Sequence, residues 1–292
     1  MPDPDGAAIE VRAAGCNFAD ALIRAGRYPQ MPELPFVPGS EVAGELDGRR
    51  VVAFVRGSGG GYAERVAADP EWTFDLPERA SFAQGAAFLL AYLTAWLPLT
   101  RQARLERGGT VLVHAAAGGV GLIMCQWAAA LGATVIGTVS TDEKAELART
   151  HGCAHPVVYT RQDFVAEVER ITAGEKLPVV YDGVGRDTFM KSLDCLRRRA
   201  IMVSFGNASG PVDAFAPATL AQKGSLFLTR PTLFDYIATR AELERAAGEL
   251  FDVVESGKVK IEVKQRLPLK DAAEAHRQLE ARKTTGSTIL TI

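Results

Sequence analysis

Short apolar runs alternate with longer amphipathic segments through the middle of this 292-residue chain. The apolar runs of strand length are residues 110–114, 134–139, 156–158, 179–182, 200–204 and 225–228. The amphipathic segments between them are residues 142–150, 161–172, 188–196 and 240–255. Strands that alternate with helices form a parallel sheet covered on both faces, so the pattern predicts an α/β, doubly wound domain here.

The pattern on either side of this region is different. Residues 1–98 are rich in glycine and proline, and short strand-like runs at 8–13, 41–46, 50–55 and 62–67 predict a mostly antiparallel β-domain. Near the C-terminus, residues 263–267 and 286–292 have strand character and flank an amphipathic segment, 270–282. We expect the last strand to pair back into the first domain. That domain then comprises residues 1–98 and 265–292, and the α/β domain comprises residues 99–264.

One uncharged stretch, residues 81–100, is about long enough to span a bilayer. It contains Gln84, Gly85 and Pro98, and no cationic flank marks one side. We therefore expect a buried helix and no membrane contact.

The most informative motif follows the first strand of the α/β region. Residues 116–121 read AAGGVG, a G-x-G-x-x-G fingerprint with alanine at its first position. Between a strand and a helix, such a turn lets the backbone approach a pyrophosphate and aims the helix N-terminus at its charge. The alternative is a plain tight turn. The residues expected at the phosphates are Ala117, Gly118, Gly119, Val120 and Gly121.

The end of the next strand indicates which dinucleotide is bound. NAD sites place a carboxylate about 20 residues past the glycines, to hold the ribose 2′-hydroxyl. Here Ser140 stands at that place and Lys144 follows one turn later, which suits a 2′-phosphate and favours NADPH. Asp142 and Glu143 between them weaken the argument. The alternative is that Ser140 caps the next helix and Lys144 is solvated.

Composition narrows the class of protein. The chain is 47% hydrophobic and 23% charged, which is typical of a globular protein. A formal net charge of −2 gives no electrostatic drive toward nucleic acid or anionic membrane. The four cysteines lie far apart without a C-x-x-C motif, and the N-terminus is acidic and polar rather than signal-like. We expect a cytoplasmic protein.

Eight segments together resemble the zinc-independent quinone oxidoreductases of the medium-chain dehydrogenase/reductase superfamily, a group that includes zeta-crystallin. They are residues 14–20 (AGCNFAD), 24–29 (RAGRYP), 38–41 (PGSE), 114–121 (HAAAGGVG), 180–185 (VYDGVG), 204–207 (SFGN), 228–231 (LTRP) and 286–287 (GS). The resemblance covers nearly the whole chain. It implies a Rossmann-type NADPH-binding domain beside a GroES-like catalytic β-domain.

The resemblance also bears on metal binding. Asn17 falls where zinc-dependent relatives have a cysteine ligand, and Ser40 falls where they have a histidine ligand. Neither side chain is a good zinc ligand, and the structural-zinc cysteines are missing, so no metal is predicted. Without a Lewis acid, quinones and enones remain feasible hydride acceptors, whereas simple ketones are poor ones.

The implied activity is NADPH-dependent transfer of reducing equivalents to a quinone or a conjugated enone. By resemblance, Asn17 lies at the nicotinamide and Tyr28 donates a hydrogen bond at the same site. The alternatives are a turn asparagine before a helix starting near Phe18 and an ordinary half-buried aromatic. The resemblance further implies cofactor contacts by Asn17, Thr94, Ser140, Lys144, Tyr159, Phe205, Gly206, Phe227, Thr229, Arg230 and Arg282. For Thr94 the alternative is a helix-interior threonine bonded to its own backbone.

Two departures from the family pattern concern the first domain. About 25 residues that usually precede it are missing before Met1, and the segment between Gly44 and Arg50 is about a dozen residues short. We expect a shortened N-terminal domain, either natural or truncated. By resemblance, the sixth strand of the Rossmann sheet would pair two chains into a homodimer.

Two other functions compete with a quinone or enone reductase. One is an enoyl-thioester reductase, which uses the same fold. The other is a non-catalytic NADPH-binding protein, and the lack of a basic stripe argues against nucleic acid as its partner.

Overall fold

The structure is a computed structural model, and it describes the whole chain except residues 1–5, 29–30, 56–59, 103–104 and 106. The chain divides into two compact units. Unit 1 comprises Met1–Leu93, Thr239–Phe251 and Ile261–Ile292, and unit 2 comprises Thr94–Ala238 and Asp252–Lys260. The divisions pass through helices α3 (Leu89–Trp96) and α9 (Arg240–Glu255). The domain boundaries expected at residues 98 and 264 stay a prediction.

Unit 1 is built on a seven-stranded, mostly antiparallel sheet. Its strands are β1 (Ala8–Cys16), β2 (Glu41–Leu46), β3 (Arg49–Phe54), β4 (Arg65–Ala67), β5 (Thr73–Asp75), β12 (Val263–Pro268) and β13 (Ser287–Thr291). Its helices, besides parts of α3 and α9, are α1 (Phe18–Arg24), α2 (Phe82–Gly85) and α10 (Ala272–Glu280). The strands follow the order β12-β13-β1-β2-β3-β5, and β4 also pairs with β1.

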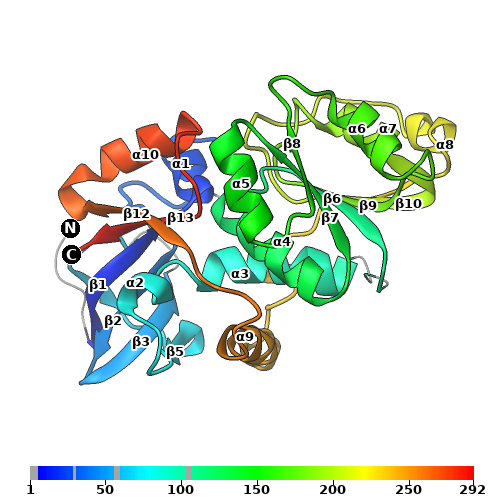
Figure 1. Cartoon of the computed structure of the whole chain (residues 1–292). Helices are drawn as coiled ribbons and strands as arrows, with labels where there is room; N and C mark the ends of the chain where they lie inside the picture. The colour runs from blue at the N-terminus through cyan, green and yellow to red at the C-terminus, as the bar shows by residue number, and fades with distance from the viewer. Residues whose placement is uncertain (1–5, 29–30, 56–59, 103–104, 106) are drawn as a thin grey trace. The chain divides into compact units, whose positions relative to one another are not determined.

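The last strand of the chain lies against the first, as the sequence predicted. β13 pairs antiparallel with β1, with Ala14 opposite Leu290, and Figure 1 shows the red and blue strands running side by side. The shortened segment between β2 and β3 is a two-residue turn. Asp47 and Gly48 have φ of 49° and 77°, the left-handed conformation that a tight hairpin turn requires and that Asp-Gly adopts readily. The sequence analysis overlooked this turn signal.

Unit 2 contains a six-stranded sheet whose strands are all parallel. They are β6 (Thr110–Val113), β7 (Thr134–Val139), β8 (His155–Val158), β9 (Leu177–Asp182), β10 (Leu196–Ser204) and β11 (Phe227–Thr229). The helices between them are α4 (Gly119–Ala130), α5 (Asp142–Thr150), α6 (Phe164–Ile171), α7 (Phe189–Asp194) and α8 (Ala218–Gln222). The predicted runs 134–139, 142–150 and 240–255 agree with β7, α5 and α9 to the residue.

The order of the strands makes this a doubly wound sheet. It reads β11-β10-β9-β6-β7-β8, so the chain winds outward first on one side of β6 and then on the other. The order reverses between β6 and β9, and in open α/β sheets ligands bind outside the carboxyl ends of the strands at that point. The predicted fold class is therefore confirmed for both units.

Each unit has its own apolar core. In unit 2, Leu112, Ile136, Val180 and Met202 from four adjacent strands are fully buried. These strands read as continuous apolar runs because helices cover both faces of a parallel sheet. In unit 1, buried side chains of β1, β2 and β3 pack with Ala275 of α10 and Leu290 of β13.

The uncharged stretch 81–100 contains the expected buried helix, α3, but it is not one continuous helix. It forms α2, then α3, and continues as a π-helical segment, Leu97–Gln102. The break follows Gly85, where a Cβ would lie 2.8 Å from Leu76 and 2.9 Å from Ala43. Among the described residues, no helix combines the length and the apolarity that crossing a bilayer requires.

Candidate functional site

The glycine-rich turn joins β6 to α4 at the switch point of the sheet. Gly118 is the extended N-cap residue of α4, and the next three residues open the helix. The amides of that first turn have no acceptor within the helix, so they face outward as donors. At Gly121 a Cβ would lie 2.2 Å from the Ala115 carbonyl oxygen, so only glycine allows this approach of helix to strand. The predicted residues Ala117 to Gly121 thus lie in the strand–turn–helix context that a pyrophosphate site requires, and their contact with the cofactor stays a prediction.

The structure brings several other predicted residues to the same edge of the sheet. Ser140, Tyr159, Phe205 and Arg230 each follow the carboxyl end of a parallel strand, β7, β8, β10 and β11 respectively. Tyr159 is 41% exposed, and its amide donates to Val139 across the two strand ends. A row of residues at these ends is the usual wall of a dinucleotide site.

The residue after Ser140, not Ser140 itself, caps helix α5. Thr141, not Ser140, is the N-cap of α5, and its hydroxyl accepts from the Lys144 amide at 3.3 Å. The capping alternative for Ser140 was therefore wrong. Lys144 is half-buried in the first turn of α5, beside that cap.

One of the two carboxylates that weakened the case for a 2′-phosphate, Asp142, is paired with a cation. Arg161 contacts both carboxylate oxygens of Asp142, one of them at 2.6 Å. This hydrogen-bonded guanidinium lowers the pKa of Asp142, although both groups are exposed. The pair offsets the negative charge of Asp142, one of the two carboxylates near Ser140. The sequence analysis missed Arg161, which lies 19 residues from its partner.

The ends of β9 and β10 approach each other closely beside the turn. At Gly206 a Cβ would lie 2.4 Å from the carbonyl oxygen of Gly183. The fully buried Asp182 accepts from the amides of Val184 and Gly185 and from the Thr188 hydroxyl, and so shapes the loop after β9. Backbone groups at Phe205 and Gly206 are thereby held in a defined place at the edge.

The end of β11 is held in a similar way. The Arg230 guanidinium donates to the Ser204 carbonyl at 3.0 Å, and the Thr229 hydroxyl donates to Gln102 at 2.8 Å. Phe227 is 61% exposed on this edge strand. No strand pairs with the outer edge of β11 within the described part of the chain.

His114, at the end of β6, is a structural residue. It is 2% exposed, and its ring nitrogens lie 2.9 Å from the Thr138 hydroxyl and 2.8 Å from the Ser192 hydroxyl. Burial lowers the pKa of this imidazole. The sequence analysis interpreted it as a satisfied core histidine, and the geometry confirms that interpretation.

A second cluster of functional groups lies in unit 1. The Asn17 side chain donates to Glu41 at 2.8 Å, and its backbone amide donates to Asp20, also at 2.8 Å. The Ser40 hydroxyl donates to the other oxygen of Asp20 at 2.6 Å, and the Leu90 amide donates to Glu41 at 2.9 Å. Asn17 is the N-cap residue of α1, but its amide group points to Glu41 instead of capping. The helix starts at Phe18, as predicted.

Both carboxyl groups in this cluster are buried, Asp20 at 0% and Glu41 at 1% exposure. Desolvation raises the pKa of Asp20 to about 6 and that of Glu41 to about 8, although hydrogen bonds to Ser40, Asn17 and Leu90 oppose the shifts. The raised pKa favours the neutral form of Glu41 around neutral pH. The sequence analysis passed over these acids, whose signal is a charged residue inside an apolar strand or helix.

Burial also raises the pKa of the neighbouring Cys16 thiol to about 12. Next to it, the Tyr62 hydroxyl lies 3.0 Å from Nε2 of His276. Among the described residues, no three His, Cys, Asp or Glu side chains come together as a metal site. The absence of a resident metal stays a prediction.

Three further predicted residues are Tyr28, Thr94 and Arg282, whose roles stay predictions. Tyr28 is half-buried in a bend after α1, and Thr94 is half-buried in α3. Arg282 follows α10 with a φ of 57°. By the division of the chain, Asn17, Tyr28 and Arg282 belong to unit 1 and the other predicted residues belong to unit 2.

Comparison with known proteins gives matches along the whole chain. Residues 3–78 match the family described as Alcohol dehydrogenase GroES-like domain, and residues 119–251 match the family described as Zinc-binding dehydrogenase. A quinone oxidoreductase of Pseudomonas aeruginosa is 47% identical over 99% of this chain and 92% of its own length.

The chain belongs to the quinone oxidoreductase family of the medium-chain dehydrogenases/reductases. A 2-haloacrylate reductase of a Burkholderia species is another relative, 40% identical over 99% of this chain and 91% of its own length. The crystal structure of Escherichia coli quinone oxidoreductase complexed with NADPH is similar with a TM-score of 0.93 and 44% identity, covering all of this chain and 94% of that one. The resemblance drawn from the sequence is confirmed.

Proposed function

We propose that this chain is an NADPH:quinone oxidoreductase that works without a resident metal. The observation that carries the proposal is the glycine-rich turn at the switch point, in a chain related over its full length to quinone oxidoreductases. The residues present fit NADPH, because the first turn of α4 presents backbone amides without helical acceptors, and Gly121 lets that turn lie close to the end of β6. When bound, the nicotinamide supplies the hydride or electrons that reduce the quinone.

The residues of unit 2 hold the cofactor in this proposal. The first-turn amides of α4 bind the pyrophosphate, and Ser140 with Lys144 binds the 2′-phosphate beside the Asp142–Arg161 pair. Backbone groups of Phe205 and Gly206 orient the nicotinamide. The remaining cofactor contacts proposed are Thr94, Tyr159, Phe227, Thr229, Arg230 and Arg282.

The residues of unit 1 orient the substrate end of the reaction. Asn17 contacts the nicotinamide ribose or the substrate, and Glu41 positions its amide through the 2.8 Å hydrogen bond. Tyr28 donates a hydrogen bond to the oxygen that gains negative charge as it accepts the hydride. These roles follow from the family resemblance and are supported by the buried network that fixes Asn17.

A conjugated carbonyl compound is the second candidate acceptor, and the 2-haloacrylate reductase relative favours it. The carbon–carbon double bond of such a compound accepts hydride while charge develops on the carbonyl oxygen. We further propose that two chains pair through the exposed edge of β11, where Phe227 and Leu228 are uncovered, and that the protein is cytoplasmic.

The experiment that tests the function is oxidation of NADPH with 1,4-benzoquinone, 9,10-phenanthrenequinone and an enone as parallel acceptors, with NADH as the cofactor control. NADPH-selective turnover with a quinone supports the proposal, and preference for the enone transfers it to the second candidate. NADPH binding without turnover of any acceptor would contradict both and indicate a cofactor-binding protein.

A further inference from the structure

A basic pocket lies at the edge of the unit 2 sheet opposite the glycine-rich turn. Its volume is about 970 Å³, at the upper end of the usual range for ligand pockets. We call it the arginine pocket, and the residues that line it are Glu175, Lys176, Leu193, Asp194, Leu196, Arg197, Arg198, Arg199, Ala221, Gln222, Lys223, Gly224 and Ser225. They precede or begin β9, β10 and β11, so they lie at the amino ends of the strands. The proposed cofactor site lies at the carboxyl ends.

A local irregularity of the sheet places three arginines at this pocket. Leu196 pairs with Leu177, and the next pair is Ile201 with Val179, so four residues of β10 stand opposite the single residue Pro178. Proline has no N–H to donate to a neighbouring strand, and the ladder between β9 and β10 is interrupted at this residue. In this bulge of β10, consecutive side chains turn outward, and residues 197–199 are all exposed.

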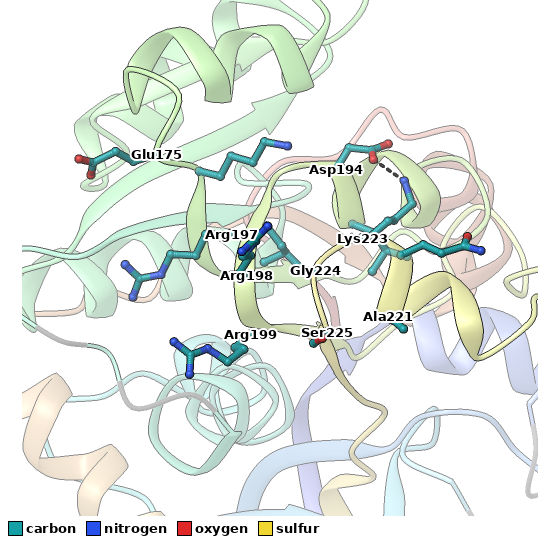
Figure 2. Close-up of a pocket in the computed structure, with 13 residues that line it drawn as sticks. Glu175, Asp194, Arg197, Arg198, Arg199, Ala221, Lys223, Gly224 and Ser225 are labelled. Carbon is teal, nitrogen blue, oxygen red and sulfur yellow. Dashed lines mark hydrogen bonds and ion pairs between the residues drawn. The ribbon is translucent and has the colours of Figure 1, made fainter.

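The conformation of the bulge is held by the next turn of the chain. The Arg199 amide donates to the Gly224 carbonyl at 2.8 Å, and Arg199 has a φ of 56°. At Gly224 a Cβ would lie 3.3 Å from the Arg198 Cα, which favours the residue without a side chain. The two walls of the pocket are therefore joined by backbone contacts, and Figure 2 shows the arginines projecting from one short stretch.

The charge of the pocket is opposite to that of the chain. The whole chain has a formal net charge of −2, whereas the pocket is lined by five basic and two acidic side chains. Lys223 is paired with Asp194, the interaction drawn in Figure 2. The guanidinium groups of Arg197, Arg198 and Arg199 make no hydrogen bond or ion pair within the described residues.

We propose that the arginine pocket binds a polyphosphate, meaning a ligand with two or more linked phosphate groups. Guanidinium groups bind phosphate oxygens through two parallel hydrogen bonds, and three adjacent ones match the closely spaced charges of a phosphate chain. The excess of positive charge exceeds what a single phosphate neutralises. Since this pocket and the glycine-rich turn lie at opposite ends of the strands, the polyphosphate and NADPH bind independently.

The test is calorimetric titration of the whole protein with inorganic tripolyphosphate, with and without saturating NADPH. We expect one site per chain whose affinity is the same in both conditions. In the variant R197S/R198S/R199S the affinity falls at least about thirtyfold, because three charge-assisted contacts are removed. The control variant R245S/R266S/K270S makes the same change in charge on exposed residues of unit 1, and its affinity stays within about twofold.

Further arms distinguish the source of the phosphate chain. Equal affinity for tripolyphosphate and adenosine triphosphate supports an inorganic chain, and tighter binding of the nucleotide supports a nucleoside polyphosphate. If the triple variant does not fold, as judged by its thermal unfolding, the single variant Arg198→Ser replaces it, with an expected loss of about fivefold. No binding of tripolyphosphate, equal binding by both triple variants, displacement by NADPH, or binding of single-stranded RNA alone would each overturn the proposal.

Discussion

The two regions proposed to act in the reaction are built in opposite ways. The cofactor edge of unit 2 is made mainly of backbone groups from one turn and from the ends of neighbouring strands. The cluster in unit 1 is made mainly of side chains: Asn17 donates to Glu41 and Ser40 donates to Asp20, while the Leu90 amide also donates to Glu41. A backbone site depends on small residues in a fixed order, whereas a side-chain site depends on distant segments and on burial. The first is sensitive to added volume and the second to charge.

The largest expected effect is at the glycine-rich turn. In Gly121→Ala the new Cβ would meet the Ala115 carbonyl oxygen at 2.2 Å, so helix α4 must shift away from β6. We expect NADPH binding, measured by fluorescence titration, to weaken at least about a hundredfold. Gly248→Ala in α9 is the matched control, because a Cβ there meets nothing within 4 Å and NADPH binding stays unchanged. Equal binding by both variants would refute the proposed pyrophosphate site.

The next effect concerns the pH dependence of stability in unit 1. The pKa of Glu41 in the folded protein is about 8, against an ordinary value of 4.5, so the folded state binds more protons and stability falls as pH rises between these values. Asp20, whose pKa is raised from 3.8 to about 6, adds a further loss of stability as the pH rises between these two values. Between pH of about 6 and 8, wild type should lose a few kcal/mol of unfolding free energy, measured by denaturant titration.

Glu41→Gln removes the titrating group and should flatten this part of the profile. It also replaces one acceptor oxygen with a donor, so we expect the variant to be less stable than wild type in acid. The difference in unfolding free energy between the two proteins should be smaller near pH 8. Glu71→Gln, at an exposed residue of the same unit, is the control and should keep the wild-type slope. A Glu41→Gln profile parallel to that of wild type would show that Glu41 is not the group responsible.

A smaller effect is expected for the choice of cofactor. Lys144→Ala removes a cation from the proposed 2′-phosphate site and should lower the preference for NADPH over NADH, as a ratio of kcat/KM, about tenfold. Arg161→Ala should lower it as well, because it leaves the Asp142 carboxylate without its partner. Arg149→Ala in the last turn of the same helix is the control. An unchanged ratio in Lys144→Ala would exclude the assignment.

The smallest effect is expected at Tyr28. Tyr28→Phe removes one hydrogen-bond donor and should lower kcat with a quinone about threefold to tenfold, while the affinity for NADPH is unchanged. Steady-state kinetics and cofactor titration measure the two quantities separately. Wild-type turnover in this variant would end the proposed role.

Much of the fold was predictable because local patterns determined it. The runs that became β7, α5 and α9 were located to the residue, since apolar periodicity and capping residues act over a few positions. The extent of the helix in the stretch 81–100 was not predictable, because α2 ends at Gly85, a residue packed closely against Leu76 and Ala43 from distant segments. The predicted run 200–204 begins four residues after the start of β10 at Leu196, because three consecutive arginines lack the apolar character that predicts a strand.

The candidate site was predictable to the same uneven extent. The turn at residues 116–121 was recognised because its function requires glycine at particular positions along the chain. The pairing of Arg161 with Asp142 and the capping by Thr141 were not recognised, because each depends on how side chains meet after folding.

The sequence by itself determined the family, the two sheets and the place of the cofactor turn, because these depend on residue order, small side chains and apolar periodicity. Only the tertiary structure decided which polar groups meet. Folding buries Asp20 and Glu41, and the loss of water around them raises their pKa values. It also places Arg197, Arg198 and Arg199 in the lining of one pocket. Desolvation and the addition of charges from separate segments are properties of three-dimensional contact, and a linear pattern does not contain them.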